Sequence, residues 1–145
     1  MRIIVQRCLE ASCKVDGKVT GQIQKGLVLL VGFTERDNKE IIDYMVKKVL
    51  NLRIFDDQNG IMNNSIDKEN AGILSISQFT LYGDPIKGNR PSYIKALNGE
   101  KAIKLYDYFN NELSKSIHVE TGVFGADMKI SLVNDGPVTI IIEKE

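Results

Sequence analysis

The sequence has little of what marks membrane or secreted proteins. No apolar run approaches the roughly 18 residues that a membrane-spanning helix needs. The longest runs, such as Leu27 to Val31, have the length of a buried strand. The first residues turn polar too early for a signal peptide. We therefore expect a soluble, cytoplasmic protein with no membrane partner.

An excess of charge of one sign is also lacking, because 19 basic side chains are balanced by 19 acidic ones. A protein that coats a duplex is usually strongly basic, so we expect no DNA partner. The balance leaves room for a local basic cluster between Ile86 and Leu105, made of Lys87, Arg90, Lys95, Lys101 and Lys104 with the single acid Glu100. A solvated loop and helix face would explain this cluster as well as a nucleic-acid contact does.

Cysteine and histidine are scarce, since Cys8, Cys13 and His118 are the only ones. This supply predicts no metal site. In an extended strand the two cysteines would lie roughly 16 Å apart on opposite faces, which predicts unpaired, buried thiols. His118 is the one histidine available to a hydrolytic triad, but its position before a β-rich run is typical of a strand edge. No Gly-rich phosphate loop opens a helix, and we predict no cofactor.

The length and composition are those of one globular domain, residues 1–145, with 43% apolar and 26% charged residues. Alternation and apolar runs predict strands over 2–15, 19–24, 26–33, 53–55, 72–81, 119–124, 128–133 and 138–143. Helical spacing predicts helices over 41–50, capped by Asp37 or Asn38, and over 99–114, with Ala102, Ile103, Tyr106, Phe109 and Leu113 on one stripe. This order predicts a compact α+β domain with a mainly antiparallel, barrel-like sheet.

Two polar segments interrupt this pattern. Ser77-Gln78-Phe79-Thr80 stands where a buried strand should stay apolar, and alternation would put Gln78 and Thr80 on one face. Asn134-Asp135-Gly136-Pro137 is typical of a turn between strands, and an X–Pro bond such as Gly136–Pro137 has access to the cis form. Carboxylates such as Asp56 and Asp57 fall in turns. An enzyme built from this inventory would depend on backbone dipoles, hydroxyls and the substrate itself.

The two segments together resemble the signature motifs of the D-aminoacyl-tRNA deacylases, also called D-tyrosyl-tRNA deacylases. The motifs are Ser77-Gln78-Phe79-Thr80-Leu81 and Asn134-Asp135-Gly136-Pro137-Val138-Thr139, with no broken position in either. The resemblance extends over the whole chain. It includes Gln6-Arg7, Gly88-Asn89-Arg90-Pro91-Ser92 and Thr121-Gly122-Val123-Phe124-Gly125-Ala126-Asp127-Met128.

The resemblance implies a hydrolase that cleaves the ester joining a D-amino acid, or glycine, to the 3′-terminal adenosine of tRNA. It also implies a homodimer in which Gly136 and Pro137, joined by a cis bond, face Ser77, Gln78, Phe79 and Thr80 of the partner. Backbone N–H groups near Phe79 and Thr80 would stabilise the oxyanion, and the ribose 2′-hydroxyl would help to activate water. The alternative is that Thr80 is a covalent nucleophile.

Other residues receive roles from the same resemblance. Arg7 would brace the Gly-Pro segment, and Phe124 and Met128 would line the pocket or the adenosine site, although strand packing explains these three equally well. Lys87 and Arg90 would meet phosphates of the acceptor end. Two rivals stay open: an editing module that removes L-serine, like that of archaeal threonyl-tRNA synthetase, and a non-catalytic dimeric binding protein.

Overall fold

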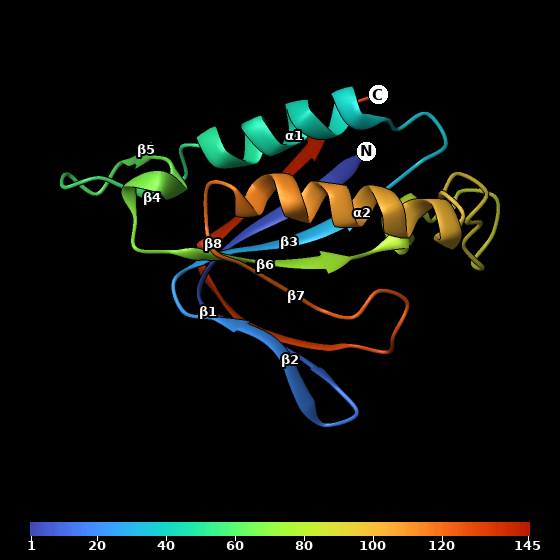
Figure 1. Ribbon diagram of the computed structural model, residues 1–145, viewed down its shortest axis with the longest axis horizontal. Helices are drawn as coiled ribbons and strands as arrows, with labels where there is room; N and C mark the ends of the chain where they lie inside the picture. The colour runs from blue at the N-terminus through green and yellow to red at the C-terminus, as the bar shows by residue number, and fades with distance from the viewer.

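A curved six-stranded sheet carries both helices on one of its faces, in a computed structural model that describes residues 1–145 (Figure 1). Its strands are β1 (Arg2–Val15), β2 (Lys18–Ile23), β3 (Gly26–Gly32), β6 (Gly72–Ser77), β7 (Val119–Thr121) and β8 (Lys129–Glu143). Their order is β2-β1-β3-β6-β7, and β8 pairs with the free side of β1. The predicted α+β class is confirmed. β1 pairs antiparallel with β2, β3 and β8, whereas the β3–β6 and β6–β7 pairs are parallel.

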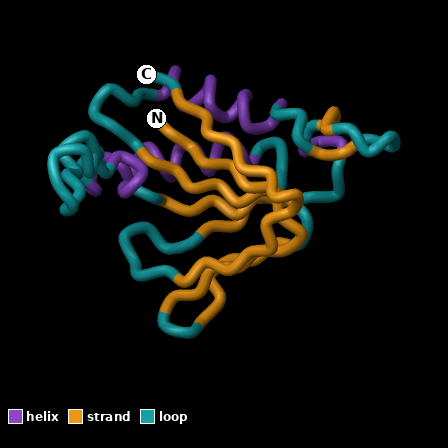
Figure 2. The backbone as a smooth tube through the Cα atoms, turned by 180° about the vertical axis from the view of Figure 1, so that it is seen from behind, coloured by secondary structure: helices purple, strands orange, loops and turns teal.

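Helices α1 (Lys39–Asn51) and α2 (Gly99–Ser114) lie side by side over the sheet, as seen from both sides in Figures 1 and 2. Asn38, one of the two predicted caps, accepts a hydrogen bond from the Ile41 N–H at 3.1 Å. The stripe predicted for α2 is buried except at Ile103, which is 38% exposed. That assignment was wrong because Ile103 directly follows Ala102 on the helix and points about 100° away from it.

The sheet encloses two apolar clusters. The larger one fills the space between the helices and the sheet, with Phe109, Leu29 and Ile73 fully buried. The smaller one lies inside the curl of the sheet and consists of Cys8, Ala11, Cys13, Ile23, Val28, Leu74 and Ile76. The central strands β3 and β6 therefore bury both of their faces, which accounts for the nearly continuous apolar run of β3.

Both cysteines are buried free thiols, as predicted, but they do not lie on opposite faces. They share the smaller cluster because β1 has one residue more than β8 between the pairs Cys8–Asn134 and Ala11–Leu132. Such bulges bend a strand and reset its alternation. The bent β1 therefore turns both thiols into the same interior.

Several predicted element ends are wrong. The strand predicted over 72–81 stops at Ser77, and a 3₁₀ turn, η2 (Phe79–Tyr82), follows it. The strands predicted over 128–133 and 138–143 are one strand, β8, which runs through the expected turn. β7 ends at Thr121, not at 124. The strand expected over 53–55 is β4 (Phe55–Asp56), paired with the unpredicted β5 (Met62–Asn64), and a short turn, η1 (Ile66–Lys68), comes next.

No helix of the structure has the length and apolar character needed to cross a membrane.

Burial raises the pKa of the Cys8 thiol from 9.0 to about 11. The unfolded chain then loses this proton at lower pH than the folded chain does, so the contribution of Cys8 to stability is complete below pH 9 and falls as the pH rises towards 11. We predict that the free energy of unfolding of the wild type declines more steeply across this window than that of Cys8→Ala, measured by urea denaturation. Parallel declines would contradict the shift.

Candidate active site

The first polar segment forms the transition from β6 into η2. The Gln78 N–H still bonds the Val31 carbonyl of β3 at 2.7 Å, and the chain then leaves the sheet. At Gly32, the last residue of β3, a Cβ would lie 3.0 Å from the Gln78 carbonyl and 3.2 Å from the Leu81 Cβ. Glycine at this position therefore lets η2 pack closely on the end of β3.

The turn leaves two backbone donors free. Leu81 N–H bonds the Gln78 carbonyl at 3.3 Å and Gly83 N–H bonds the Thr80 carbonyl at 2.9 Å. The N–H groups of Phe79 and Thr80 donate to no acceptor in the chain, as expected for the first residues of a helical turn. The Gln78 side-chain amide donates to the Thr80 hydroxyl. The segment thus presents main-chain donors and no acid or base.

A cavity of about 530 Å³ adjoins this turn and brings together five of the predicted site residues: Ser77, Gln78, Phe79, Phe124 and Met128. Its far wall is the segment after β7, where the Phe124 ring packs on Tyr106 with centroids 5.8 Å apart. Sequence reasoning missed the apolar lining from Val31, Phe33, Leu97, Ala102 and Ile130. Nothing in their pattern separates them from ordinary core residues.

The second polar segment is an exposed irregularity within β8. The Gly136–Pro137 bond is cis and Gly136 has φ +116°, a value that favours glycine. Arg7 lies beneath it, only 7% exposed, and a Cβ on Gly136 would be 3.3 Å from Arg7 Nη2. The Asn134 amide donates to the carbonyls of Arg7 at 3.0 Å and Val138 at 3.1 Å, which closes the segment on itself.

Arg7 connects this segment to the rest of the chain by charge. Its Nη1 donates to the Ile54 carbonyl at 2.8 Å and lies 3.2 Å from Asp56 Oδ1. Its Nε lies 3.2 Å from Asp135 Oδ2, without an aligned hydrogen bond. A nearly buried guanidinium with partners on two other segments, 54–56 and β8, is a rigid support for Gly136.

The two polar segments do not meet within one chain. Ser77 of β6 is in register with Val31 of β3 and Ile3 of β1. Arg7, which lies under Gly136, is in register with Leu27 and Ile73. Four residues of strand separate these levels, about 13 Å. Neither Gly136 nor Pro137 lines the cavity. A single chain therefore holds the two motifs at opposite ends of the sheet.

Thr80, the next residue of the turn, does not line the cavity, and the remaining predicted residues also lie outside it. Lys87 and Arg90 are exposed on a loop that two hydrogen bonds between Asp84 and Ser92 close, at 2.8 and 2.9 Å. His118 is exposed at the amino end of β7 and lies 3.5 Å from Glu120, away from Ser77 at the carboxyl end of β6. No group of three or more His, Cys, Asp or Glu side chains gathers anywhere in the structure.

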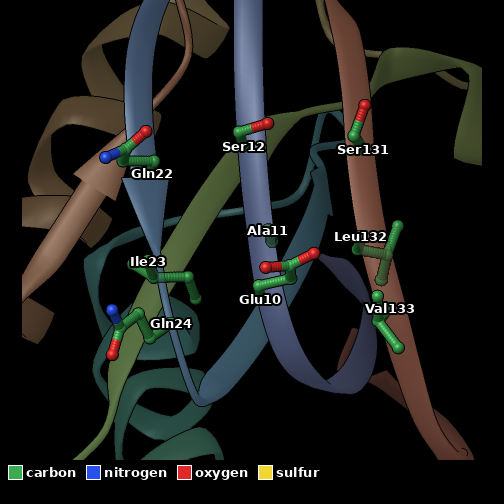
Figure 3. A pocket seen from close by; sticks show the side chains of 9 residues that line it. All are labelled: Glu10, Ala11, Ser12, Gln22, Ile23, Gln24, Ser131, Leu132 and Val133. Carbon is green, nitrogen blue, oxygen red and sulfur yellow. The ribbon is translucent and has the colours of Figure 1, made fainter.

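A second hollow, of about 590 Å³, lies on the outer face of β2, β1 and β8 (Figure 3). Polar side chains such as Glu10, Ser12 and Gln22 line it, and it contains no predicted site residue. It is open and carries no convergent set of reactive groups, so the cavity beside η2 remains the candidate active site.

This combination defines a class of protein: a small α+β chain with an apolar pocket and unpaired main-chain donors at its edge. Such donors stabilise an oxyanion, and a site without an acid–base pair suits an ester that is already activated. Residues 4–143 match the family model described as D-Tyr-tRNA(Tyr) deacylase, and the chain belongs to this family. The resemblance seen in the sequence, and with it the prediction of a hydrolase, is confirmed.

Relatives with known names agree. A D-aminoacyl-tRNA deacylase of Bacillus cytotoxicus is 54% identical over 100% of both chains, and one of Bacteroides fragilis is 54% identical over 99% of this chain and 97% of its own.

Solved structures share the fold of this chain. The "c-Myc DNA Unwinding Element Binding Protein" is 37% identical, with a TM-score of 0.95 and coverage of 100% of this chain and 99% of its own. A probable eukaryotic D-amino acid tRNA deacylase, 18% identical with a TM-score of 0.82 and 97% coverage of both chains, shares the fold.

Proposed function

We propose that this protein hydrolyses the ester between a D-amino acid and the 3′-terminal adenosine of tRNA, releasing the free D-amino acid and tRNA. The observation that carries the proposal is the pair of unpaired N–H groups of Phe79 and Thr80 beside an apolar cavity, in a chain of this family. The same site accepts glycine mischarged on tRNA(Ala), because glycine has no side chain to exclude. The reaction is a proofreading step in translation and takes place in the cytoplasm.

The mechanism uses main-chain donors and the substrate. Water attacks the ester carbonyl, and the N–H groups of Phe79 and Thr80 stabilise the oxyanion, with the Ser77 hydroxyl and the Gln78 amide close by. The tetrahedral intermediate then collapses and the ribose 3′-oxygen leaves with a proton. The neighbouring 2′-hydroxyl assists the attacking water. The one carboxylate in the cavity lining, Asp127, accepts hydrogen bonds from Lys129 Nζ at 2.9 and 3.1 Å and is not assigned as the base. Thr80 is a poor nucleophile because its hydroxyl contacts the Gln78 amide, a group that accepts no proton from it.

Chirality is selected by the Gly136–Pro137 segment of a second copy. Main-chain carbonyls of this segment accept hydrogen bonds from the substrate α-amino group, so that an L side chain collides with backbone and a D side chain points outward. Two observations support this assignment: the segment is exposed and held by Arg7 and Asn134, and it lies about 13 Å from the level of Ser77 in its own chain. A twofold homodimer brings each segment to the other's cavity.

Contact with tRNA is confined to its acceptor end. Lys87 and Arg90 are exposed on the loop that follows η2, where they meet phosphates near the terminal adenosine. Phe124 and Met128 line the side of the cavity that receives the adenosine or the amino acid. A footprint this small needs a local basic loop and no net positive charge.

We predict that the purified protein deacylates D-tyrosyl-tRNA at least about 100-fold faster than L-tyrosyl-tRNA, because a rigid backbone wall excludes the L side chain. The measurement is release of labelled tyrosine over time. L-Seryl-tRNA(Thr) is the comparison substrate, and preferential cleavage of it would instead favour an L-serine editing module. Tight binding of a D-aminoacyl adenosine analogue without ester cleavage would favour a non-catalytic protein.

The cross-subunit site is tested by complementation. Phe79→Pro deletes one oxyanion donor, and Gly136→Val puts a side chain on the segment that enters the partner's cavity. We expect each homodimer to be inactive, and co-refolded mixtures to recover about a quarter of the wild-type sites, since half of random dimers are mixed and each holds one intact site. The wild type should sediment as a dimer of two 16.2 kDa chains. No recovery in mixed dimers, or a fully active monomer, would refute the arrangement.

Substrate assistance and the Thr80 alternative make opposite predictions. With D-tyrosyl-tRNA ending in 2′-deoxyadenosine, turnover should fall by about 100-fold or more, the usual scale for a lost proton-transfer group. Thr80→Val keeps its N–H and loses only the hydroxyl, and we expect it to retain activity within about tenfold of the wild type. Normal turnover of the deoxy substrate combined with an inactive Thr80→Val would establish Thr80 as the nucleophile.

A further inference from the structure

The η2 turn is short of internal restraints at the place where the proposed reaction needs rigidity. Its first two N–H groups are unpaired, and Phe79 is 57% exposed. An oxyanion donor is effective only when it stays within 2.7–3.1 Å of the developing charge. Side chains from outside the turn must therefore hold it in place.

We propose that Arg2 and Tyr93 are positioning residues that hold the two ends of η2 in place. They thereby fix the orientation of the Phe79 and Thr80 N–H groups. This inference rests on the proposed function, because it assigns these two side chains a role in the same reaction. Neither residue belongs to the two signature segments, and neither lines the cavity.

Arg2 grips the end of the turn. Its Nη1 donates to the Leu81 carbonyl at 2.6 Å, and its Nη2 donates to Glu143 Oε1 of β8 at 2.7 Å. The guanidinium also lies 4.9 Å from the centre of the Tyr82 ring. Because Arg2 and Glu143 are paired residues of β1 and β8, the end of η2 is tied to the sheet.

Tyr93 grips the start of the turn. Its ring meets that of Phe79 edge-on, with centroids 5.1 Å apart and planes inclined by 66°. The backbone around Tyr93 is itself fixed, by the Asp84–Ser92 hydrogen bonds on one side and by the 2.9 Å bond from Leu97 N–H to the Phe33 carbonyl on the other. At Gly83 a Cβ would lie 3.0 Å from Tyr93 Cε1, so the ring sits directly against the chain leaving η2.

These contacts act on the donors through the backbone. Phe79 carries both the ring that Tyr93 holds and one of the two free N–H groups. Releasing the ring lets this residue rotate, and a misplacement of about 1 Å at a reacting centre can cost about 100-fold in rate. A partly loosened turn should lower kcat, while substrate binding through the rest of the cavity is preserved.

The test compares four variants with the wild type on D-tyrosyl-tRNA. Tyr93→Ala and Arg2→Ala should each lower kcat by about tenfold with KM changed by less than about twofold. Tyr93→Phe keeps the ring and should restore kcat. The matched control is Tyr44→Ala, which removes a tyrosine of similar exposure, 44% against 42%, from α1.

Amide hydrogen exchange of the free protein gives a readout that does not need turnover. Exchange of the hydrogen-bonded amides of Leu81 and Gly83 should quicken in Tyr93→Ala and Arg2→Ala and stay unchanged in Tyr44→Ala. Unchanged exchange, unchanged kcat, an effect confined to KM, or a Tyr93→Phe variant as impaired as Tyr93→Ala would each overturn the proposal. If the wild type hydrolyses no D-aminoacyl-tRNA, the proposed function fails. Faster exchange in the two variants would still show that Arg2 and Tyr93 restrain η2.

Discussion

The end of the β3–β6 ladder at Ser77 is the constraint on which the site depends. Up to this residue the backbone groups of β6 are satisfied by neighbouring strands, and beyond it the chain turns so tightly that two N–H groups find no partner. Phe79 and Thr80 are both exposed, so these two donors are open to solvent. In the proposed reaction, a substrate oxygen takes the place of water beside the cavity that Phe124 and Met128 line.

The proposed selection of chirality requires a stiff Gly136–Pro137 segment, and Arg7 lies beneath this segment at an electrostatic cost. A nearly buried guanidinium is tolerated only when several acceptors surround it. Ile54 and Asp56 accept its hydrogen bonds and Asp135 forms an ion pair with it, so the same charge joins β1, the β4 region and β8. A lysine has one point of charge and could not serve these directions at once.

Sequence periodicity predicted both helices, the long first strand and the buried β3, because each has a clear apolar pattern over many residues. Periodicity failed to predict where strands end, because a few backbone hydrogen bonds decide this. Alternation predicted a strand up to Leu81, whereas the chain turns at Phe79. The turn signal at Asn134 was overruled by pairing with β1 on both sides of the segment.

The site followed a similar division. The cavity lining includes Ser77, Gln78 and Phe79, which stood out as a polar break in an apolar strand, and Phe124 and Met128, which only the family resemblance singled out. The roles of these residues stay predictions. Leu97 and Ala102 did not stand out, since a pocket wall and a core are made of the same side chains. No sequence pattern pointed to Arg2 and Tyr93. Their role depends on tertiary contacts, Arg2 with Leu81 and Tyr93 with Phe79, that join positions far apart in the sequence.

The free amides of η2 also bear on how such a protein can be inhibited or altered. A backbone N–H group does not titrate and is not oxidised or alkylated under ordinary conditions. Among single substitutions, only one to proline removes it. No cysteine or histidine lines the pocket, and its one serine, Ser77, has no histidine nearby to activate it. Effective inhibitors should instead be stable mimics of the tetrahedral intermediate. Such a compound would place a negatively charged oxygen within hydrogen-bond distance of the Phe79 and Thr80 N–H groups.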